Sequence, residues 1–495
     1  MKIEKVAVIG AGVMGSGIAA HVANAGLPVT LLDIIPKGSD NRNVIAETAV
    51  QKMLKPVKMG SPTPLMHRKN AELISTGNIE DHLDKIGDAD LIIEVVLEKL
   101  DIKQNVFKKI DKVRKKDSIV ASNTSTIPRK QLVNGMPKTF AADFIIAHFF
   151  NPPRYLRLLE IVAGKEVSQK KIEIVSKFCD TRLGKEVVIC NDTPGFIGNR
   201  IGTYWTLVGM VEAVRMGLTV EEADAIMGRP IGAPKTGIFA LGDVVGLDLI
   251  PHVTESMSSN LPKDDMYNIG VNEQKKLGIE KILSSMIMDG YTGRKGKGGF
   301  YRLNSESGKK IKEARDLKTG EYHKATRKVG LESVKAAKKG LRQLVEYNDK
   351  GGEYAWNVLS KTLAYAASLV PNITDTIVNV DLAMKNGFLW KKGPFEMLDD
   401  LGPSWFASRI AEDGIKIPKL LESVAEGNFY EENNDIVLFF GTDGKYHKIN
   451  RPKGYLTAAD IKRGKEAIFK NPSASLWDMG DQIILAEFHS KMNSM

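Results

Sequence analysis

Three glycines near the N-terminus have the spacing of a loop that binds a dinucleotide. The motif reads Gly10-Ala-Gly12-Val-Met-Gly15, and it lies between the strand-like run 5–9 and a helix-like run of small residues. In such a motif Gly10 permits a tight turn, Gly12 lets the backbone approach a pyrophosphate, and Gly15 lets helix and strand pack closely. The helix N-terminus would offer unpaired N–H groups and partial positive charge to the phosphates.

An acidic residue, Asp33, ends the second strand-like run, 21 residues after Gly12. A carboxylate there accepts hydrogen bonds from both hydroxyls of the adenosine ribose and would repel a 2′-phosphate. Residues 34–36 contain no arginine that could attract that phosphate. The sequence therefore predicts NAD rather than NADP as cofactor; the alternative is a glycine turn without a ligand.

A histidine and a glutamate, His148 and Glu160, have types and spacing that suit proton transfer. If the runs 143–149 and 156–162 form an antiparallel hairpin symmetric about residue 154, these two residues lie opposite each other. Histidine accepts a proton near neutral pH, and a carboxylate on its other ring nitrogen fixes the tautomer and stabilises the imidazolium. A histidine in an apolar strand is more often a satisfied core residue, so the spacing alone leaves both interpretations open.

The elements that must position these residues alternate between two kinds over the first 190 residues. Strand candidates lie at 6–9, 29–32, 91–96, 119–121 and 144–150, with helix-like stretches such as 15–25 and 102–113 between them. This alternation predicts a βαβ sheet covered by helices, an α/β domain of the Rossmann type over residues 1–190. After Pro194-Gly195 the pattern becomes helical, which predicts an all-α domain over residues 191–303.

Four ordered segments identify a family that the chain resembles from residue 1 to about 410, the 3-hydroxyacyl-CoA dehydrogenases. The segments are Ala121-Ser-Asn-Thr-Ser125, His148-Phe-Phe-Asn-Pro152, Leu158-Leu-Glu160-Ile-Val, and Asp192-Thr-Pro-Gly-Phe-Ile-Gly-Asn199-Arg200. The resemblance implies oxidation of an (S)-3-hydroxyacyl-CoA to the 3-oxoacyl-CoA, with hydride transfer to NAD, as in fatty-acid β-oxidation.

The same resemblance assigns roles to individual residues. It implies that His148 is the catalytic base, that Glu160 is its partner, and that two neutral donors hold the substrate oxygen: Ser125 and Asn199. It also matches two further residues, Glu98 and Lys103, to positions that contact the cofactor. Because Asn199 lies in the first predicted helix of the all-α domain, the site would close between two domains.

Two other interpretations remain open at this point. The β-hydroxyacid dehydrogenases share the Gly-x-x-Met-Gly turn, but they use a lysine on a Gly-rich helix, and this chain shows no such pattern. A protein of another class, an NAD-binding scaffold without activity, would not need both His148 and Glu160. An assay of NADH absorbance with acetoacetyl-CoA would discriminate between these classes.

The chain repeats a ten-residue pattern in its C-terminal half. Residues 237–246 and 393–402 both read Gly-x-Phe-x-x-x-Asp-x-x-Gly. Upstream of each pattern, an asparagine precedes another aspartate by nearly the same number of residues: Asn199 before Asp224, and Asn357 before Asp381. We therefore expect two all-α domains, 191–303 and 353–415, joined by a basic linker at 304–352 with an amphipathic helix at 332–347. Single-function relatives dimerise through one such domain, so a packing role in place of a partner subunit is expected for the second copy.

The last segment, 416–495, is expected to be a mixed tail. Residues 471–495 resemble the start of an enoyl-CoA hydratase (crotonase) domain, with an ordinary β-hairpin as the alternative. The strand-prone run 482–488 would have an unpaired edge. We expect it to pack back on residues 430–450, where the runs 439–442 and 445–449 predict a hairpin.

Composition limits the remaining classes. The 495 residues carry a net charge of +10, which fits either a solvated basic surface or attraction of an acidic ligand, and no motif for binding nucleic acid accompanies it. There are only two cysteines, no signal-like N-terminus, no apolar run long enough to span a membrane, and no metal-ligand spacing among the eight histidines. We therefore expect a cytoplasmic enzyme without a metal, with a separate enoyl-CoA hydratase or thiolase subunit as a candidate partner.

Overall fold

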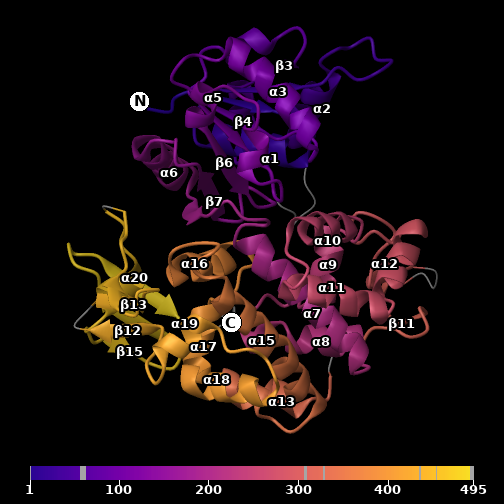
Figure 1. Cartoon of the computed structure of the whole chain (residues 1–495), viewed down its shortest axis with the longest axis vertical. Coiled ribbons are helices and arrows are strands. Elements are labelled where there is room, and N and C mark those ends of the chain that lie inside the picture. Colours follow the sequence, from indigo (N-terminus) through magenta and orange to yellow (C-terminus); the bar gives the residue numbers. More distant parts are fainter. Residues whose placement is uncertain are drawn as a thin grey trace.

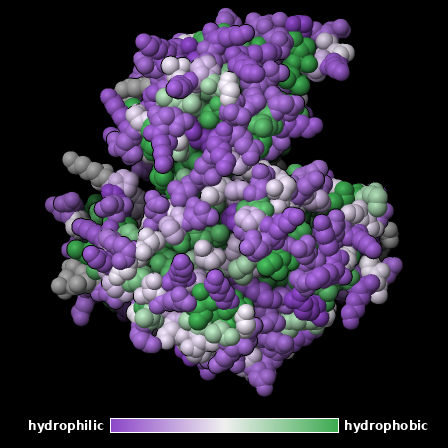
Figure 2. Space-filling view, in the orientation of Figure 1, coloured by the Kyte–Doolittle hydropathy of each residue, from purple (hydrophilic) through white to green (hydrophobic). Residues whose placement is uncertain are grey.

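The computed structural model describes residues 2–55, 63–305, 309–326, 329–433, 436–452 and 454–490. A dinucleotide-binding domain, at the top in Figure 1, sits on two helical modules that lie side by side beneath it. The face seen in Figure 2 is mainly hydrophilic and narrows where the upper domain meets the helical modules. Within the described ranges, no helix has both the length and the apolar character needed to cross a bilayer.

The upper domain is built on one eight-stranded sheet in the order β3-β2-β1-β4-β5-β6-β7-β8. The strands are β1 (Val6–Ile9), β2 (Val29–Asp33), β3 (Ile74–Asn78), β4 (Leu91–Glu94), β5 (Ile119–Ser122), β6 (Phe144–Phe149), β7 (Leu158–Ala163) and β8 (Glu186–Cys190). The strands from β3 to β6 pair in parallel, β7 is antiparallel to β6, and β8 follows β7 in parallel.

Helices cover this sheet, so its central strands are apolar along their whole length. The helices include α1 (Val13–Asn24), α2 (Val44–Leu54), α3 (Leu100–Val113) and α6 (Gln169–Leu183). Every residue of β1, β4, β5 and β6 is buried, as expected for strands with cover on both faces. The Rossmann-type fold is confirmed, and the predicted strands differ from the observed ones by one or two residues at their ends. The two outer strands, β3 and β8, were not predicted.

The predicted hairpin is also present. Strand β6 pairs with β7 in the register that places His148 opposite Glu160. Symmetry about residue 154 was therefore sufficient to fix which side chains face each other across these two strands.

The first helical module comprises residues 195–326. Its helices are α7 (Gly198–Arg215), α8 (Val220–Ile226), α9 (Phe239–Val245), α10 (Leu249–Asn260), α11 (Met266–Lys276) and α12 (Ile279–Met288). A three-stranded antiparallel sheet follows them: β9 (Tyr301–Asn304), β10 (Ile311–Arg315) and β11 (Tyr322–Lys324).

This sheet corrects the prediction that 304–352 is a basic linker. The carboxylate of Asp243 in α9 accepts hydrogen bonds from the backbone of Phe300 and Tyr301, both at 2.8 Å, and so attaches β9 to the helices. The single amphipathic helix predicted at 332–347 is wrong as well. Gly340 has φ +146°, a conformation that a helix cannot contain, and the segment divides into α13 (Glu332–Ala336), a 3₁₀ turn and α14 (Leu341–Val345).

The second helical module comprises residues 331–448 and repeats the design of the first. After α13 and α14 come α15 (Lys350–Leu369), α16 (Ile377–Gly387), α17 (Pro394–Leu401), α18 (Pro403–Glu412) and α19 (Lys419–Val424), and then a sheet of β12 (Tyr430–Asn433), β13 (Ile436–Phe440) and β14 (Tyr446–Lys448). The expected hairpin near 439–449 is therefore present. The helical region does not end at 415, however, because α19 continues it to Val424. Asp399 of α17 then accepts hydrogen bonds from the backbone of Phe429 and Tyr430, which attaches the sheet to the helices.

The two modules use the same pairs of aspartates. Asp224 accepts hydrogen bonds from the backbone at the start of α9, and Asp381 does the same at the start of α17. Asp243 and Asp399 then each bind the backbone at the start of a sheet whose last strand reads Tyr-His-Lys. The repeat in the sequence therefore extends well beyond the ten residues from which it was recognised.

The modules contact each other mainly through α7 and α15. The hydroxyl of Tyr354 donates to the carbonyl of Gly209 (2.9 Å), and the ring of Tyr365 lies 4.3 Å, centroid to centroid, from that of Tyr204. Helix α16 of the second module and the turn before it also cover the edge of the upper sheet. Asn379 in α16 and Thr374 in that turn both donate to the carbonyl of Ile189 in β8. An edge strand that would otherwise be open is thus covered.

The tail, residues 449–490, forms α20 (Ala458–Lys462) and a third small sheet of β15 (Phe469–Lys470), β16 (Ala474–Asp478) and β17 (Ile484–Phe488). This sheet is separate from β12–β14, so the run at 482–488 does not add a strand to that hairpin; an ion pair between Arg463 and Glu432 (3.3 Å) is one contact between the two regions. One face of the tail sheet packs on α20, where Lys462 binds Glu487. The other face is apolar and open, with three exposed side chains: Phe469, Ile484 and Phe488.

Candidate active site

The glycine loop leads from β1 into α1 with the geometry that its spacing predicts. Gly10 has φ +110°, and a Cβ there would lie 2.5 Å from the carbonyl oxygen of Val95. A Cβ on Gly15 would overlap the backbone of Gly10, whereas one on Gly12 would meet no atom within 4 Å. The close packing thus requires two of the glycines, and the third borders the open space that a pyrophosphate would fill.

Asp33 lies beside this loop at the end of β2. One carboxylate oxygen accepts a hydrogen bond from the backbone N–H of Ala11, and the other from that of Ile34 at 2.6 Å. The side chain thereby fixes the glycine loop and faces the sheet edge where the ribose of a dinucleotide would lie. These residues fit NAD.

Three apolar side chains near the same sheet edge are exposed, and sequence reasoning did not single them out. Val13 is 75% exposed, Ile34 58% and Leu97 68%. Val13 and Ile34 directly follow predicted site residues, and Leu97 directly precedes one. The available signal was therefore an apolar residue next to a predicted site residue. Such side chains supply apolar contact to the flat rings of a dinucleotide.

His148 and Glu160 form a buried pair between the strands β6 and β7. The imidazole Nδ1 lies 2.7 Å from Oε2 of Glu160, and the two side chains are 5% and 0% exposed. Among the described residues, no group binds the other ring nitrogen, Nε2. The ring centroids of Phe150 and Phe196 lie 4.6 and 5.7 Å from the centroid of the imidazole. The arrangement leaves Nε2 available to accept a proton from a ligand.

Glu160 also holds the first helical module. Its second oxygen, Oε1, accepts hydrogen bonds from the backbone N–H groups of Ile197 (3.0 Å) and Gly198 (2.7 Å), at the start of α7. The partial positive charge of a helix N-terminus stabilises a carboxylate in that position. One side chain thus orients His148 and anchors the helix whose first turn contains Asn199.

Ser125 and Asn199 are both partly exposed and reach this region from the two domains. Ser125 follows β5, which pairs with β6 so that Ser122 lies opposite Ile146, two residues before His148. Asn199 directly follows Gly198. Among the residues that the structure describes, no protein group binds the hydroxyl of Ser125 or the carboxamide of Asn199. Two neutral donors therefore remain free to bind an oxygen of a ligand.

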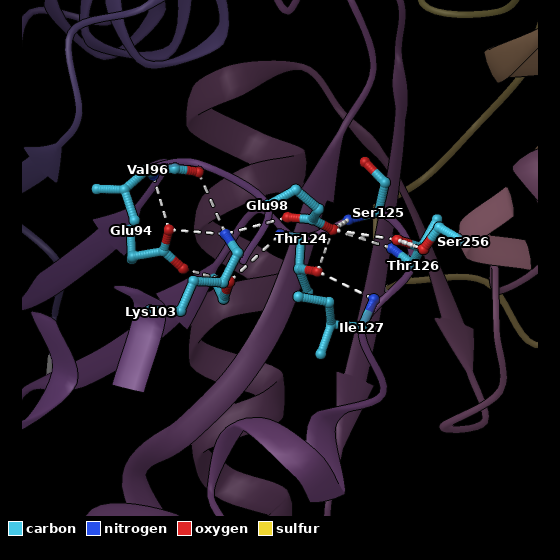
Figure 3. A network of polar contacts seen from close by, with 10 residues as sticks. Glu94, Val96, Glu98, Lys103, Thr124, Ser125, Thr126, Ile127 and Ser256 are labelled. Carbon is cyan, nitrogen blue, oxygen red and sulfur yellow. Dashed lines mark hydrogen bonds and ion pairs between the residues drawn. The ribbon is translucent and has the colours of Figure 1, made fainter. Parts of the chain in front are cut away.

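Glu98 and Lys103 belong to a network of polar contacts beside the loop of Ser125 (Figure 3). Lys103 is buried and lies 2.8 Å from Glu94 and 3.1 Å from Glu98. Burial alone would lower the pKa of Lys103, but the two carboxylates raise it above its usual value. Burial alone would raise the pKa of Glu98, but Lys103 and the hydrogen bonds from Thr124 and Ser125 lower it below its usual value. Both groups are charged at neutral pH.

Sequence reasoning missed the polar residues that hold this loop. Asn123 accepts a hydrogen bond from the backbone of Phe149 (2.8 Å), and Asp192 accepts two from the backbone of Arg129 (2.6 Å) and Lys130 (2.9 Å). Both lie in segments that were already recognised, so their position in those segments was the available signal. Within the described part of the chain, no three histidine, cysteine, aspartate or glutamate side chains are grouped so as to hold a metal ion.

Comparison with known proteins agrees with this geometry. Residues 5–193 match the family of the 3-hydroxyacyl-CoA dehydrogenase, NAD binding domain, and residues 195–303 match the 3-hydroxyacyl-CoA dehydrogenase, C-terminal domain. A crystal structure of 3-hydroxybutyryl-CoA dehydrogenase from Escherichia coli shares the fold, with a TM-score of 0.61 at 20% identity over 86% of this chain and 98% of that one.

Three curated relatives are similar in sequence. A probable 3-hydroxyacyl-CoA dehydrogenase of Bacillus subtilis is 40% identical over all of this chain and 63% of its own length, and a putative fatty acid oxidation complex trifunctional enzyme of Rickettsia felis is 38% identical over all of this chain and 64% of its own. A probable 3-hydroxyacyl-CoA dehydrogenase of Deinococcus radiodurans is 40% identical over 62% of this chain and 84% of its own length. The chain therefore spans less than two thirds of the first two relatives.

The fold and the glycine loop define an NAD-binding oxidoreductase domain joined to helical modules. The matches to both domain families and to the relative from Deinococcus radiodurans make the assignment more specific. The chain belongs to the 3-hydroxyacyl-CoA dehydrogenase family.

Proposed function

We propose that this protein oxidises (S)-3-hydroxyacyl-CoA to 3-oxoacyl-CoA with NAD, as an L-3-hydroxyacyl-CoA dehydrogenase. The observation that carries the proposal is the buried pair of His148 and Glu160, in which Nδ1 is bound and Nε2 has no partner among the residues described. A base in this arrangement suits removal of a proton from a hydroxyl group. NAD, when bound, supplies the acceptor for the hydride of C3.

The roles of the protein groups follow from their positions. Nε2 of His148 takes the proton of the 3-hydroxyl, while Glu160 keeps the other ring nitrogen protonated and stabilises the imidazolium. Ser125 and Asn199 donate hydrogen bonds to the substrate oxygen, which both the alcohol and the ketone can accept. Because Asn199 comes from the first helical module, the substrate oxygen would lie between the two domains.

The cofactor side of the proposal rests on the glycine loop, Asp33 and Glu98. The loop would bind the pyrophosphate and Asp33 the adenosine ribose. Glu98 is 38% exposed and can reach a cofactor, whereas Lys103 is 1% exposed. We therefore assign Lys103 an effect on the cofactor site through Glu98 rather than a direct contact.

The metabolic setting is proposed from the names of the relatives. The trifunctional fatty acid oxidation enzyme of Rickettsia felis supports a place in fatty-acid β-oxidation, and the resemblance of residues 471–495 to a crotonase start supports an enoyl-CoA hydratase as a partner. An acyl-CoA substrate and a cytoplasmic location remain predictions from the sequence.

A substitution of His148 tests the reaction. His148→Gln should lower the turnover of acetoacetyl-CoA with NADH by about 10²- to 10⁴-fold, because in this reverse direction the imidazolium donates the proton to the ketone oxygen and glutamine cannot replace it. The affinity for NADH, measured by fluorescence, should stay near that of the wild type. The matched control is His447→Gln, an exposed histidine on β14 of the second module. A His148→Gln enzyme with more than about a tenth of wild-type turnover would contradict the proposal.

A further inference from the structure

Three groups of the loop that carries Ser125 bind one carboxylate, that of Glu98. One oxygen of Glu98 accepts hydrogen bonds from the hydroxyl of Thr124, from the backbone of Ser125 (2.9 Å) and from the backbone of Thr126 (3.2 Å). The other oxygen of Glu98 lies 3.1 Å from Lys103. The backbone position of Ser125 therefore depends directly on an ion pair within the upper domain (Figure 3).

The same loop is tied to the first helical module by a different contact. The hydroxyl of Ser256 in α10 donates to the hydroxyl oxygen of Thr126 at 2.7 Å, although the two residues are 130 positions apart in the chain. Thr126 is 3% exposed, and its own hydroxyl can donate to Glu98 at 3.4 Å. A polar chain thus runs from Lys103 through Glu98 and Thr126 to Ser256.

Helix α10 contacts both the loop of Ser125 and the junction between the upper domain and the first module. Met257, which follows Ser256, is fully buried, and its sulfur lies against Gly195 at the junction of the two domains; a Cβ on Gly195 would meet it at 2.5 Å. At the far end of the loop, Asp192 of that junction binds the backbone of Arg129 and Lys130. Two contacts of this region, at Thr126 and at residues 129 and 130, therefore lead to the junction.

We propose that Ser256 is a positioning residue of the active site, acting through Thr126. Its hydrogen bond sets the loop of Ser125 at a fixed position relative to α7, so that the hydroxyl of Ser125 and the carboxamide of Asn199 converge on one oxygen only while the upper domain and the first module are in contact. The chemical consequence rests on the proposed function; the tie itself does not.

The kinetic test compares two serines of the same helix. Ser256→Ala should lower kcat for acetoacetyl-CoA about 3- to 10-fold, the factor that one hydrogen bond supplies, with the dissociation constant for NADH unchanged. Ser256→Thr, which keeps the hydroxyl, should restore most of the loss. Ser259→Ala is the control, because this exposed serine donates only within α10, to the carbonyl of Ser256. Thr126→Val should reproduce the loss, and the double variant with Ser256→Ala should be no slower than Thr126→Val alone.

A second measurement does not depend on activity. In the wild type, the amides of Ser125 and Thr126 should exchange slowly with solvent, and Ser256→Ala should speed this exchange about tenfold while Ser259→Ala leaves it unchanged. Unchanged exchange in Ser256→Ala would overturn the tie. Additive losses in Ser256→Ala and Thr126→Val, or a wild-type kcat in Ser256→Ala, would overturn its part in positioning. A wild type without any turnover would instead count against the proposed function.

Discussion

The two helical modules share one framework but differ in what they present to the upper domain. In the first, α7 begins at the carboxylate of Glu160 and carries Asn199. In the second, the corresponding asparagine, Asn357, lies in the second turn of α15 and its amide contacts the sulfur of Met216 at 3.5 Å. Duplication has thus kept the aspartates that hold the framework, whereas only one copy retains a free polar group at the site.

The second module instead supports the first. Its Phe388 ring packs so closely on α7 that a Cβ on Gly202 would overlap it, and its α16 covers the edge strand β8. This agrees with the packing role predicted for the second copy, which stays a prediction until it is tested. The comparison teaches that a repeat can be identified from its framework residues, while its function must be read from the residues that differ.

The largest expected effect separates the two asparagines. Asn199→Ala should lower kcat by about 10²-fold, because it removes a donor to the substrate oxygen where negative charge develops. Asn357→Ala should stay within about twofold of the wild type, since the one hydrogen-bond partner of its amide among the described residues is a methionine sulfur. Steady-state kinetics with acetoacetyl-CoA and NADH measure both. Similar losses in the two variants would remove the functional difference between the modules.

A moderate effect is expected at the contact between the modules. The hydroxyl of Tyr365 in α15 binds Arg200 of α7 and, at 2.7 Å, Asp265 of α11. Tyr365→Phe should lower stability by about 1 kcal/mol, visible as a lower Tm, and should change kcat less than twofold. The control is Tyr347→Phe, a more exposed tyrosine of the second module. A large loss of kcat in Tyr365→Phe would show that the second module acts on the chemistry as well as on packing.

The smallest effect distinguishes the aspartates by pH. Burial raises the pKa of Asp224 to about 7 and that of Asp399 to about 6. Because the folded state holds the proton more tightly than the unfolded one, these groups favour folding at low pH, and that contribution is lost as pH rises through the folded pKa. The Tm should therefore rise as pH falls from 8 to 5. Asp224→Asn should flatten this slope up to pH 7, and Asp399→Asn only up to about pH 6. Equal slopes in all three proteins would contradict the assignment.

Local patterns in the sequence were sufficient for the centre of the upper domain but not for its outer strands β3 and β8. Buried parallel strands are apolar throughout, glycine positions in the dinucleotide loop are fixed by steric overlap, and a hairpin register follows from its symmetry, so β1, Gly10 and the pair of His148 and Glu160 were predictable. The assignment of Ser125 and Asn199 needed the resemblance to a family, because nothing in their local sequence indicates a free donor.

Contacts between distant segments were not predictable in the same way. The stretch 304–352 is rich in lysine and glycine, which is typical of a linker, yet Asp243 binds the backbone just before it and attaches the first strand of a sheet there. The tie between Thr126 and Ser256 joins two residue types that occur at any surface, and only the packing of α10 on the junction brings them together. Information of this kind lies in tertiary structure rather than in periodicity.

The double attachment of Glu160 has a consequence for anyone who wishes to divide or recombine this protein. A fragment that ended at residue 190 would keep both members of the buried pair but would lose the two N–H donors of Ile197 and Gly198, leaving one carboxylate oxygen without a partner in an apolar interior. A chimera should therefore take its new helical module with the turn 195–199 matched to the host's glutamate. The boundary for engineering lies after the first turn of α7, not at residue 190.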